Sequence, residues 1–246
     1  MTARLTVEYD GSEFAGWARQ PGKRSVQAEL ERALATILRE PVRLTVAGRT
    51  DAGVHALAQV ASYEGEPARV SGLNALLPPD VAVLSCERAP DGFNARFDAT
   101  SRAYCYRLLA RPDRAALSRE RAWHFSYPID PALLHACAAA LVGKHDFTAF
   151  TPSDTYHRRF EREVLTAYWR ADHAGLYEFL IEADTFMRNM NRVLVGTMVE
   201  VARGWRTAES FRELLEGAPR SAAGATAPAR GLHLYGVGYG GERVIG

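Results

Sequence analysis

The sequence predicts a mixed α+β protein built as two halves. Segments in which polar and apolar residues alternate are interspersed with segments whose apolar residues recur at helical spacing. The regular strand–helix repeat of a doubly wound parallel sheet is missing. A turn cluster at 89–92 and an irregular connection after it mark the expected boundary. We therefore predict an N-terminal half at 1–98 and a C-terminal half at 99–246, each with a mainly antiparallel sheet and helices on one side.

The N-terminal half reads as strand, helix, strand, loop, strand, helix, strand. Leu5, Val7 and Tyr9 alternate as the inward face of the first strand, and Ser25 is placed to cap the first helix. The predicted strands are 4–9, 42–46, 56–63 and 81–88, and the predicted helices are 26–38 and 70–77.

The C-terminal half repeats a similar order with insertions. Asp130 and Thr207 are placed to cap helices, and Pro131 fits a first helical position. Long loops are expected at 147–159 and 217–230. The predicted strands are 102–110, 122–125, 163–170, 176–184 and 232–239, and the predicted helices are 131–142, 190–203 and 208–215.

Composition points to an ordinary globular chain in the cytoplasm. The 246 residues are 47% hydrophobic and 24% charged, which is enough for a sizeable core without staples. Three cysteines form no CxxC pair, so we expect reduced thiols. No apolar run approaches the ~20 residues that cross a membrane, and no leader is evident. Of 30 basic residues only Lys23 and Lys144 are lysine, which fits either phosphate recognition or codon bias.

The stretch Ala47–His55 is longer and more polar than a hairpin turn requires. Gly48 and Gly53 flank Asp51 and permit backbone angles that are closed to other residues. Such a loop can present a carboxylate for chemistry, whereas a lone turn aspartate more often bonds its own backbone. Arg49 is able to serve that carboxylate, a phosphate or only the solvent. Residue types alone leave these alternatives open.

Tyr104 and Arg192 are candidates from the C-terminal half. Tyr104 and Tyr106 share one strand face beside several arginines, a pattern typical of nucleic-acid binding, although for Tyr106 a place in the core of the sheet is at least as good an alternative. Arg192 begins a helix directly after a strand, where it either pairs with Asp51 and keeps it ionised or forms a surface ion pair. Further cations are candidates for contacts with RNA, although each can also be a solvated surface charge. They are Arg102, Arg107, Arg111, Arg19, Lys23, Arg24, the run Tyr156-His157-Arg158-Arg159, and Arg162.

Several chemistries have no support in the sequence. No GxGxxG or GxxxxGK[ST] phosphate loop is present, so a nucleotide cofactor is not expected. The seven histidines do not match zinc-ligand spacings, and there is no GxSxG elbow. His55 either orients the loop that precedes it or fills space below it.

The segment Ala47-Gly48-Arg49-Thr50-Asp51-Ala52-Gly53-Val54-His55-Ala56 strongly resembles the signature of the tRNA pseudouridine synthase A family. Other motifs of that family follow in order along nearly the whole chain. They are Glu8-Tyr9-Asp10-Gly11 with Phe14, Gly16-Trp17 and Gln20, then Ser25-Val26-Gln27, Leu77-Pro78-Pro79-Asp80-Val81, Phe93-Asn94-Ala95-Arg96-Phe97, Ala99-Thr100-Ser101-Arg102-Ala103-Tyr104-Cys105-Tyr106, His145-Asp146-Phe147-Thr148-Ala149-Phe150 and Pro228-Ala229-Arg230-Gly231-Leu232.

The resemblance implies the pseudouridine synthase fold, with two ferredoxin-like (RRM-like) halves around a central cleft. It implies isomerisation of uridine to pseudouridine at positions 38, 39 and 40 in the anticodon stem-loop of tRNA. It also implies a homodimer with tRNA lying across both subunits, and neither a metal nor an organic cofactor.

Residue roles follow from positions in the family's motifs. Asp51 matches the catalytic aspartate, Tyr104 the tyrosine that packs against the target base, and Arg49 the arginine that helps to flip it. Arg192 matches the arginine that pairs with the aspartate. The chain departs from the usual Met-Val-Arg-Asn at Met190-Asn191-Arg192-Val193, but it keeps the arginine.

Two rival functions are open to test. A non-catalytic RNA-binding protein would use the same sheets and arginines, and would bind tRNA whatever residue stands at 51. A glycosidic-bond hydrolase of the retaining type would want two carboxylates, and the loop offers one. Within the isomerase reading, Asp51 either attacks C1′ or C6 or removes the C2′ proton.

Overall fold

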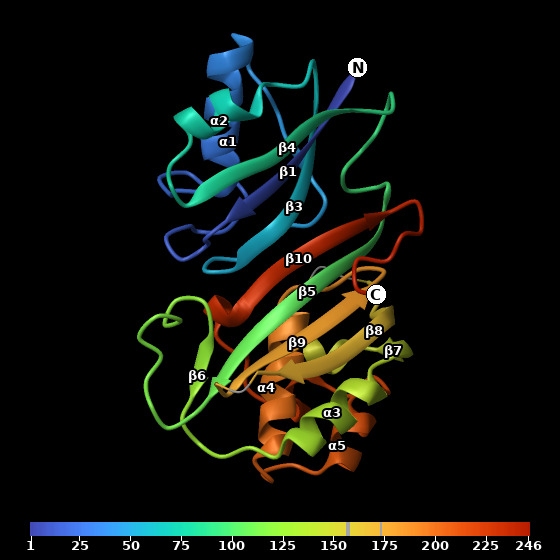
Figure 1. Cartoon of the computed structure of the whole chain (residues 1–246). Coiled ribbons are helices and arrows are strands. Elements are labelled where there is room, and N and C mark those ends of the chain that lie inside the picture. Colours follow the sequence, from blue (N-terminus) through green and yellow to red (C-terminus); the bar gives the residue numbers. More distant parts are fainter. Residues whose placement is uncertain (156–157, 173) are drawn as a thin grey trace. The chain divides into compact units, whose positions relative to one another are not determined.

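The computed structural model describes residues 1–155, 158–172 and 174–246, and the chain divides into two compact units (Figure 1). The first unit comprises Met1–Arg102 and His233–Val244, and the second comprises Ala103–Leu232 and Ile245–Gly246. The final strand thus returns to the first unit. The boundary between the two halves that the sequence predicts, between residues 98 and 99, stays a prediction.

The first unit follows the predicted order of elements. Its strands lie in the order β4-β1-β3-β10, with β1 antiparallel to both neighbours and β10 parallel to β3 through the pair His233 and His55. The helices α1 and α2 pack on each other, and α2 contacts β4. The elements are β1 (Thr2–Tyr9), α1 (Val26–Leu38), β2 (Thr45–Val46), β3 (His55–Glu64), α2 (Val70–Leu76), β4 (Val81–Ala89) and β10 (Leu232–Tyr239).

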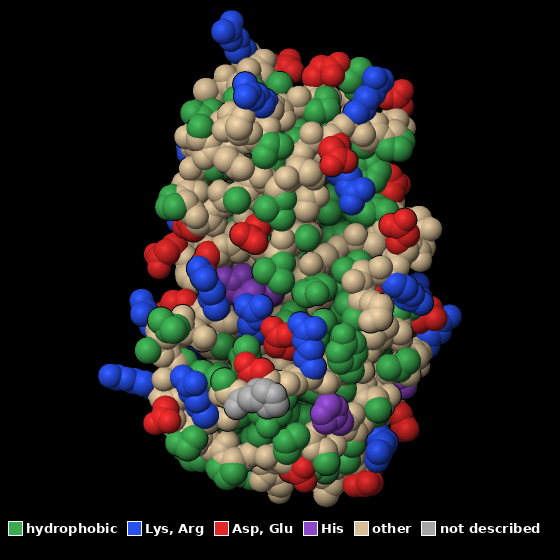
Figure 2. All heavy atoms as spheres, in the orientation of Figure 1, with side chains coloured by type: hydrophobic (Ala, Val, Ile, Leu, Met, Phe, Trp, Pro, Cys, Tyr) green, Lys and Arg blue, Asp and Glu red, His purple; other side chains and the backbone are tan. Residues whose placement is uncertain are grey.

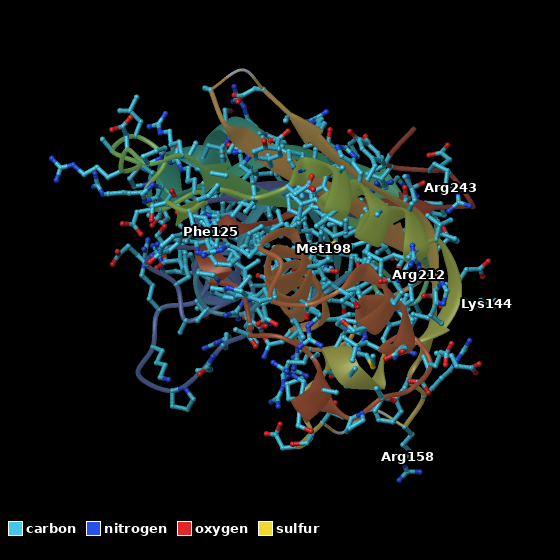
Figure 3. All side chains as sticks on the ribbon, turned by 90° about the horizontal axis from the view of Figure 1, so that it is seen from below. Phe125, Lys144, Arg158, Met198, Arg212 and Arg243 are labelled. Carbon is cyan, nitrogen blue, oxygen red and sulfur yellow. The ribbon has the colours of Figure 1, made fainter. Side chains whose placement is uncertain are left out.

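The second unit places α3, α4 and α5 against one another, with α3 also on β8. Strand β8 is antiparallel to β7 and β9. Figure 3 shows Met198 of α4 among packed side chains, whereas Lys144 and Arg158 point outward. The elements are β5 (Ala99–Ala110), which begins in the first unit, β6 (Trp123–Phe125), α3 (Pro131–Ala140), β7 (Gly143–Asp146), β8 (Glu161–Ala171), β9 (Leu176–Ala183), α4 (Met190–Ala202), α5 (Ala208–Glu213) and three short 3-10 helices at Thr148–Phe150, Arg220–Ala222 and Ala229–Gly231.

The predicted fold class is confirmed, since the chain is a mixed α+β protein with largely antiparallel strands. Two of the three predicted helix caps are also confirmed. The Asp130 carboxylate accepts from the Ala132 amide, and the Thr207 hydroxyl accepts from the Ser210 amide.

The predicted cap at Ser25 is wrong. Ser25 stands before α1 in extended conformation, but its side chain makes no capping bond. The first amides of α1 are satisfied by a distant segment instead, because Val26 donates to the Gly16 carbonyl and Gln27 to the Trp17 carbonyl at 3.3 and 3.0 Å. Tertiary contacts have therefore replaced the local cap.

The strand β7 was not predicted from the sequence. Gly143, expected just past the end of a helix, begins this strand with a φ of +113°, and the helix ends three residues earlier. The loop expected at 147–159 contains a 3-10 helix, Thr148–Phe150. Residues 156 and 157 of the predicted basic run lie outside the described residues.

Candidate functional site

Segments far apart in the sequence hold the backbone of the loop from Ala47 to His55. At its start, the Ala47 amide donates to the Val60 carbonyl at 2.9 Å. The Gln59 side-chain amide donates to the Gly48 carbonyl at 2.8 Å. In the middle, the Thr50 carbonyl accepts from the Trp17 amide at 3.0 Å. These bonds fix the loop on both sides of Arg49, the residue two before Asp51.

A buried polar network lies under the loop. The Tyr9 and Thr50 hydroxyl oxygens are 2.7 Å apart, and Gln59 donates to the Tyr9 oxygen at 3.3 Å. All three side chains are buried. Burial raises the pKa of Tyr9 to about 12, although the hydrogen bonds from Thr50 and Gln59 act the other way. Tyr9 is therefore a neutral phenol at any working pH, and the network positions Thr50 immediately before Asp51.

Two glycines let a second loop lie directly against the first. A Cβ at Gly11 would sit 2.0 Å from the Val54 carbonyl oxygen, and one at Gly16 would sit 2.7 Å from the Thr50 carbonyl oxygen. Gly16 has a φ of +101°, which other residues rarely adopt. Glycine is thus required at positions 11 and 16, because the backbone of this second loop lies directly against the backbone of the loop that carries Asp51.

His55 orients the end of the loop. Its Nδ1 accepts a hydrogen bond from the Gly11 amide at 3.0 Å, and its ring stacks on His233 at 4.7 Å between centroids. The bond to Gly11 favours the first of the two roles open from the sequence, because it ties the end of the loop to a distant segment.

Arg102 fastens the loop at its other end. Its guanidinium donates to the carbonyls of Ala47, Ala99 and Arg96, the first and last of them from Nη2 at 2.9 and 2.7 Å. The sequence offered Arg102 as an RNA contact, but these bonds turn its guanidinium toward the protein's own backbone.

Asp51 itself is exposed, and so is Arg49. The Asp51 carbonyl accepts from the Val54 amide at 3.2 Å, and Gly53 completes this turn with a φ of +75°. Within the described part of the first unit, the Asp51 carboxylate takes part in no hydrogen bond or ion pair. The alternative that the sequence left open, a turn aspartate whose side chain bonds its own backbone, is therefore wrong. The carboxylate is held by its backbone and left accessible.

In the second unit, Tyr104 is only 9% exposed and its ring meets Phe186 edge-on, with centroids 5.0 Å apart. Its neighbour Tyr106 is a core residue, as the alternative reading held. The Tyr106 hydroxyl donates to the Pro228 carbonyl at 2.9 Å, and its ring leaves no room for a Cβ at Gly231. Burial raises the pKa of Tyr106.

Arg192 is half-buried in the first turn of α4. Its Nε donates to the Ala227 carbonyl at 2.7 Å, and its Nη1 donates to the Asn189 side-chain oxygen at 3.1 Å. Asn189 has a φ of +61°, a left-handed conformation that asparagine tolerates better than most residues. Gly196 lets the chain at Ala225 come close to the helix, since a Cβ there would sit 1.8 Å from the Ala225 oxygen. The guanidinium is thus oriented from both sides.

The connection between β9 and α4 serves both candidates of the second unit. Phe186 packs on Tyr104, and Asn189 bonds Arg192. Asp51 and Arg49 belong to the first unit, so the convergence of all four residues on one substrate stays a prediction.

Several predicted RNA-contacting cations have other partners. Arg24 forms a bidentate pair with Asp80 at 2.6 and 2.8 Å and lies over the Phe14 ring. Arg162 is only 6% exposed, and burial lowers its pKa. Arg158 and Arg159 are exposed. Figure 2 shows Lys and Arg interspersed with Asp and Glu over the visible face.

Sequence reasoning missed the residues that hold the loop: Tyr9, Gln59 and Arg102. Gln59 carried a usable signal, because an amide within a strand of apolar residues must find buried partners. Arg102 carried none, since its acceptors are backbone carbonyls.

Among the described residues, no group of three or more His, Cys, Asp and Glu is arranged to hold a metal ion. Within the same residues, no helix is long and apolar enough to cross a membrane.

Comparison with known proteins gives a consistent result. A family model described as tRNA pseudouridine synthase matches residues 5–98 and 137–240. A tRNA pseudouridine synthase A of Cereibacter sphaeroides is 42% identical over 245 residues, which cover 96% of each chain. Proteins of the same name from Geobacter sulfurreducens and Bacillus velezensis are 41% and 39% identical, covering 96% and 97% of this chain and 98% and 99% of their own.

Among solved structures, the crystal structure of a Cbf5-Nop10-Gar1 complex contains a chain with a TM-score of 0.38 and 9% identity. The alignment covers 80% of this chain and 54% of that one, and the likeness is too slight to carry an argument.

Proposed function

Because the chain belongs to the tRNA pseudouridine synthase family, and is thus an isomerase that converts uridine to pseudouridine in tRNA, we propose that it acts at positions 38, 39 and 40 of the anticodon stem-loop. Asp51 is the proposed catalytic aspartate. The chain has the pseudouridine synthase fold.

One observation carries the proposal for Asp51. Its carboxylate is exposed and makes no bond within the described part of its unit, while the backbone before it is bonded to Trp17 and to Gln59 and Val60 of β3. A reacting group must be both accessible and fixed in direction, because a small displacement greatly lowers the reaction rate. A surface aspartate with no catalytic role would not need these backbone hydrogen bonds.

The reaction breaks the bond from N1 to C1′ and forms a bond from C5 to C1′. C5 then loses its proton and N1 gains one, so no atom or electron is lost overall. Asp51 acts in this proposal as the nucleophile at C1′ or C6, or as the base that removes the C2′ proton. In each case it has to be an anion when the reaction begins.

The other residues keep the roles that the family motifs imply. Tyr104 packs against the base and holds it while the base turns. The edge-on contact with Phe186 orients the Tyr104 ring. Arg49 helps to flip the nucleotide and offsets part of the few kcal/mol that unstacking costs. Arg192 pairs with Asp51, and the bonds to Asn189 and Ala227 set its direction. The enzyme works as a cytoplasmic homodimer that binds tRNA across both subunits, and it needs no cofactor.

The decisive experiment uses tRNA labelled with tritium at uridine C5, since the exchange of C5 for N1 releases the label to water. The parent protein should release tritium, and Asp51→Asn should release it about 10²- to 10⁴-fold more slowly, the range expected for a lost acid–base group. Asp91→Asn, a change at an exposed turn aspartate of the same unit, is the matched control and should be unaffected.

Position is tested with anticodon stem-loops that carry uridine at a single place. Substrates with uridine only at 38, only at 39 or only at 40 should each be modified, and one with uridine only at 35 should not. Equal release by Asp51→Asn and the parent would refute the role of Asp51. Tight tRNA binding without any release by the parent would favour an RNA-binding protein, and free uracil would favour a hydrolase.

A further inference from the structure

The turn from Phe93 to Asp98 presents an aromatic side chain that the reaction does not account for. Phe97 is 80% exposed, among the largest values for an apolar side chain in the described residues. Arg96 beside it is also exposed, with its guanidinium 6.0 Å from the Phe97 ring centroid. Among the residues that the structure describes, no carboxylate pairs with Arg96.

This turn is rigid. The Asn94 side-chain oxygen accepts from the amides of Arg96 and Phe97 at 3.0 and 3.1 Å, and the Asp98 carboxylate accepts from the Asn94 amide at 2.8 Å. Ala95, between them, is fully buried and donates to Ser62. An aromatic ring on a chain end or a mobile loop would not have these hydrogen bonds. The exposure of Phe97 therefore follows from the hydrogen-bonded conformation of this turn.

The same turn is attached to the loop that carries Asp51. Ala95 packs in one small cluster with Ala47 and Val60, at the point where the loop begins. Arg102 Nη2 donates to both the Arg96 and the Ala47 carbonyls, so these two oxygens lie less than 6 Å apart. Arg102 and the cluster around Ala95 therefore link the turn that carries Arg96 and Phe97 to the loop that carries Asp51.

We propose that Phe97 stacks on a nucleobase of the tRNA substrate other than the target uridine, and that Arg96 contacts a neighbouring phosphate. An exposed aromatic ring beside a guanidinium is the combination that recognises unpaired RNA, because every base has a face to stack on and every linkage carries a charge. This inference rests on the proposed function. It makes Phe97 and Arg96 substrate-positioning residues, which bring the stem-loop into register with Asp51.

Binding is measured with the Asp51→Asn protein and an anticodon stem-loop RNA, so that no turnover intervenes. Adding Phe97→Ala should weaken binding about 5- to 150-fold, the range for one lost base stack. Phe97→Trp should retain the affinity of the parent. Leu117→Ala is the matched control, because Leu117 is also an exposed apolar side chain but lies in the second unit. The melting temperature of all variants should be unchanged.

The salt dependence of RNA binding distinguishes the contribution of Arg96 from that of Phe97. Arg96→Ala should reduce the slope of log K against log salt by about 0.7 to 0.9, the loss of one phosphate contact. Phe97→Ala should lower the affinity at every salt concentration and leave the slope alone. With Asp51 restored, Phe97→Ala should raise KM more than it lowers kcat.

Unchanged affinity and KM in Phe97→Ala, in a protein whose parent forms pseudouridine, would overturn this inference and leave the proposed function standing. A parent that forms no pseudouridine but loses RNA affinity with Phe97→Ala would instead refute the proposed function and support the contact. Loss of affinity in Phe97→Trp equal to that in Phe97→Ala would count against stacking.

Discussion

The loop that carries Asp51 and the first turn of α4, which carries Arg192, are fixed in different ways. Around Asp51 the bonds run to the backbone: the carbonyls of Ala47, Gly48 and Thr50 are all occupied by donors from other segments. The side chain itself is left alone. Around Arg192 the bonds run to the side chain, whose own nitrogens reach the Asn189 oxygen and the Ala227 carbonyl.

The difference fits the roles proposed for Asp51 and Arg192. A carboxylate that reacts must keep its oxygens for the substrate, so its direction has to come from the main chain. An arginine that supports another charge has five donors, and it can use some of them for its own orientation. Backbone substitutions should therefore damage the first region most, and the loss of a side-chain acceptor should damage the second. Three substitutions test this contrast.

Gly16→Ala should have the largest effect. The new Cβ would lie 2.7 Å from the Thr50 carbonyl oxygen, at a φ of +101°, so the loop before Asp51 must move. We expect at least a 100-fold loss of kcat in tritium release, because displacement by about 1 Å can cost that much. Strain should also cost about 1–3 kcal/mol in the free energy of unfolding, measured with urea.

Gly22→Ala is the matched control. Gly22 also has a positive φ, +69°, but a Cβ there meets nothing within 4 Å. It should lower stability by about 1 kcal/mol and leave kcat unchanged. If both variants lose activity alike, backbone strain and not the contact with Thr50 is responsible.

Asn189→Gly should have a smaller effect, and of a different kind. Glycine adopts the left-handed conformation more easily than asparagine, so stability should stay level or rise by a few tenths of a kcal/mol. The acceptor for Arg192 Nη1 is lost, and we expect kcat to fall about 5- to 10-fold, the worth of one hydrogen bond. Asn189→Asp keeps an acceptor and should retain activity. A fall in stability without a fall in kcat would contradict the positioning role.

Tyr9→Phe should have the smallest effect on activity and a distinct effect on stability. It leaves the buried Thr50 hydroxyl without its partner, which should cost about 1–3 kcal/mol at neutral pH. The pKa of Tyr9 is about 12 in the folded chain, above the ordinary value of 10, so the unfolded chain loses its proton first. The stability that Tyr9 contributes is therefore fully present below pH 10 and is lost as the pH rises toward 12.

Urea unfolding at pH 9, 10 and 11 measures this contribution. The parent should lose up to about 1.4 kcal/mol per pH unit more than Tyr9→Phe above pH 10. Parallel pH dependence in the two proteins would mean that Tyr9 titrates normally. Activity near neutral pH should fall only a few-fold, because the backbone bonds to Thr50 and Gly48 remain.

The sequence by itself determined most elements of this fold and the location of the carboxylate proposed to react. Alternation and helical spacing are local, so β1, β3, α1 and α4 fall within a residue or two of their predicted bounds. The caps at Asp130 and Thr207 also bond residues only two or three positions away. The motif around Asp51 could be recognised for the same reason, because it is contiguous.

Only the tertiary structure decided what holds that carboxylate in place. Tyr9 and Thr50 are 41 positions apart, and Arg102 and Ala47 are 55 apart. Such bonds leave no period or spacing in the sequence, since a backbone carbonyl accepts whatever residue carries it. For the same reason Ser25 was predicted to be a cap, and Arg24 and Arg102 were predicted to contact RNA. The partners of these two arginines, and of the amides after Ser25, lie far away in the sequence.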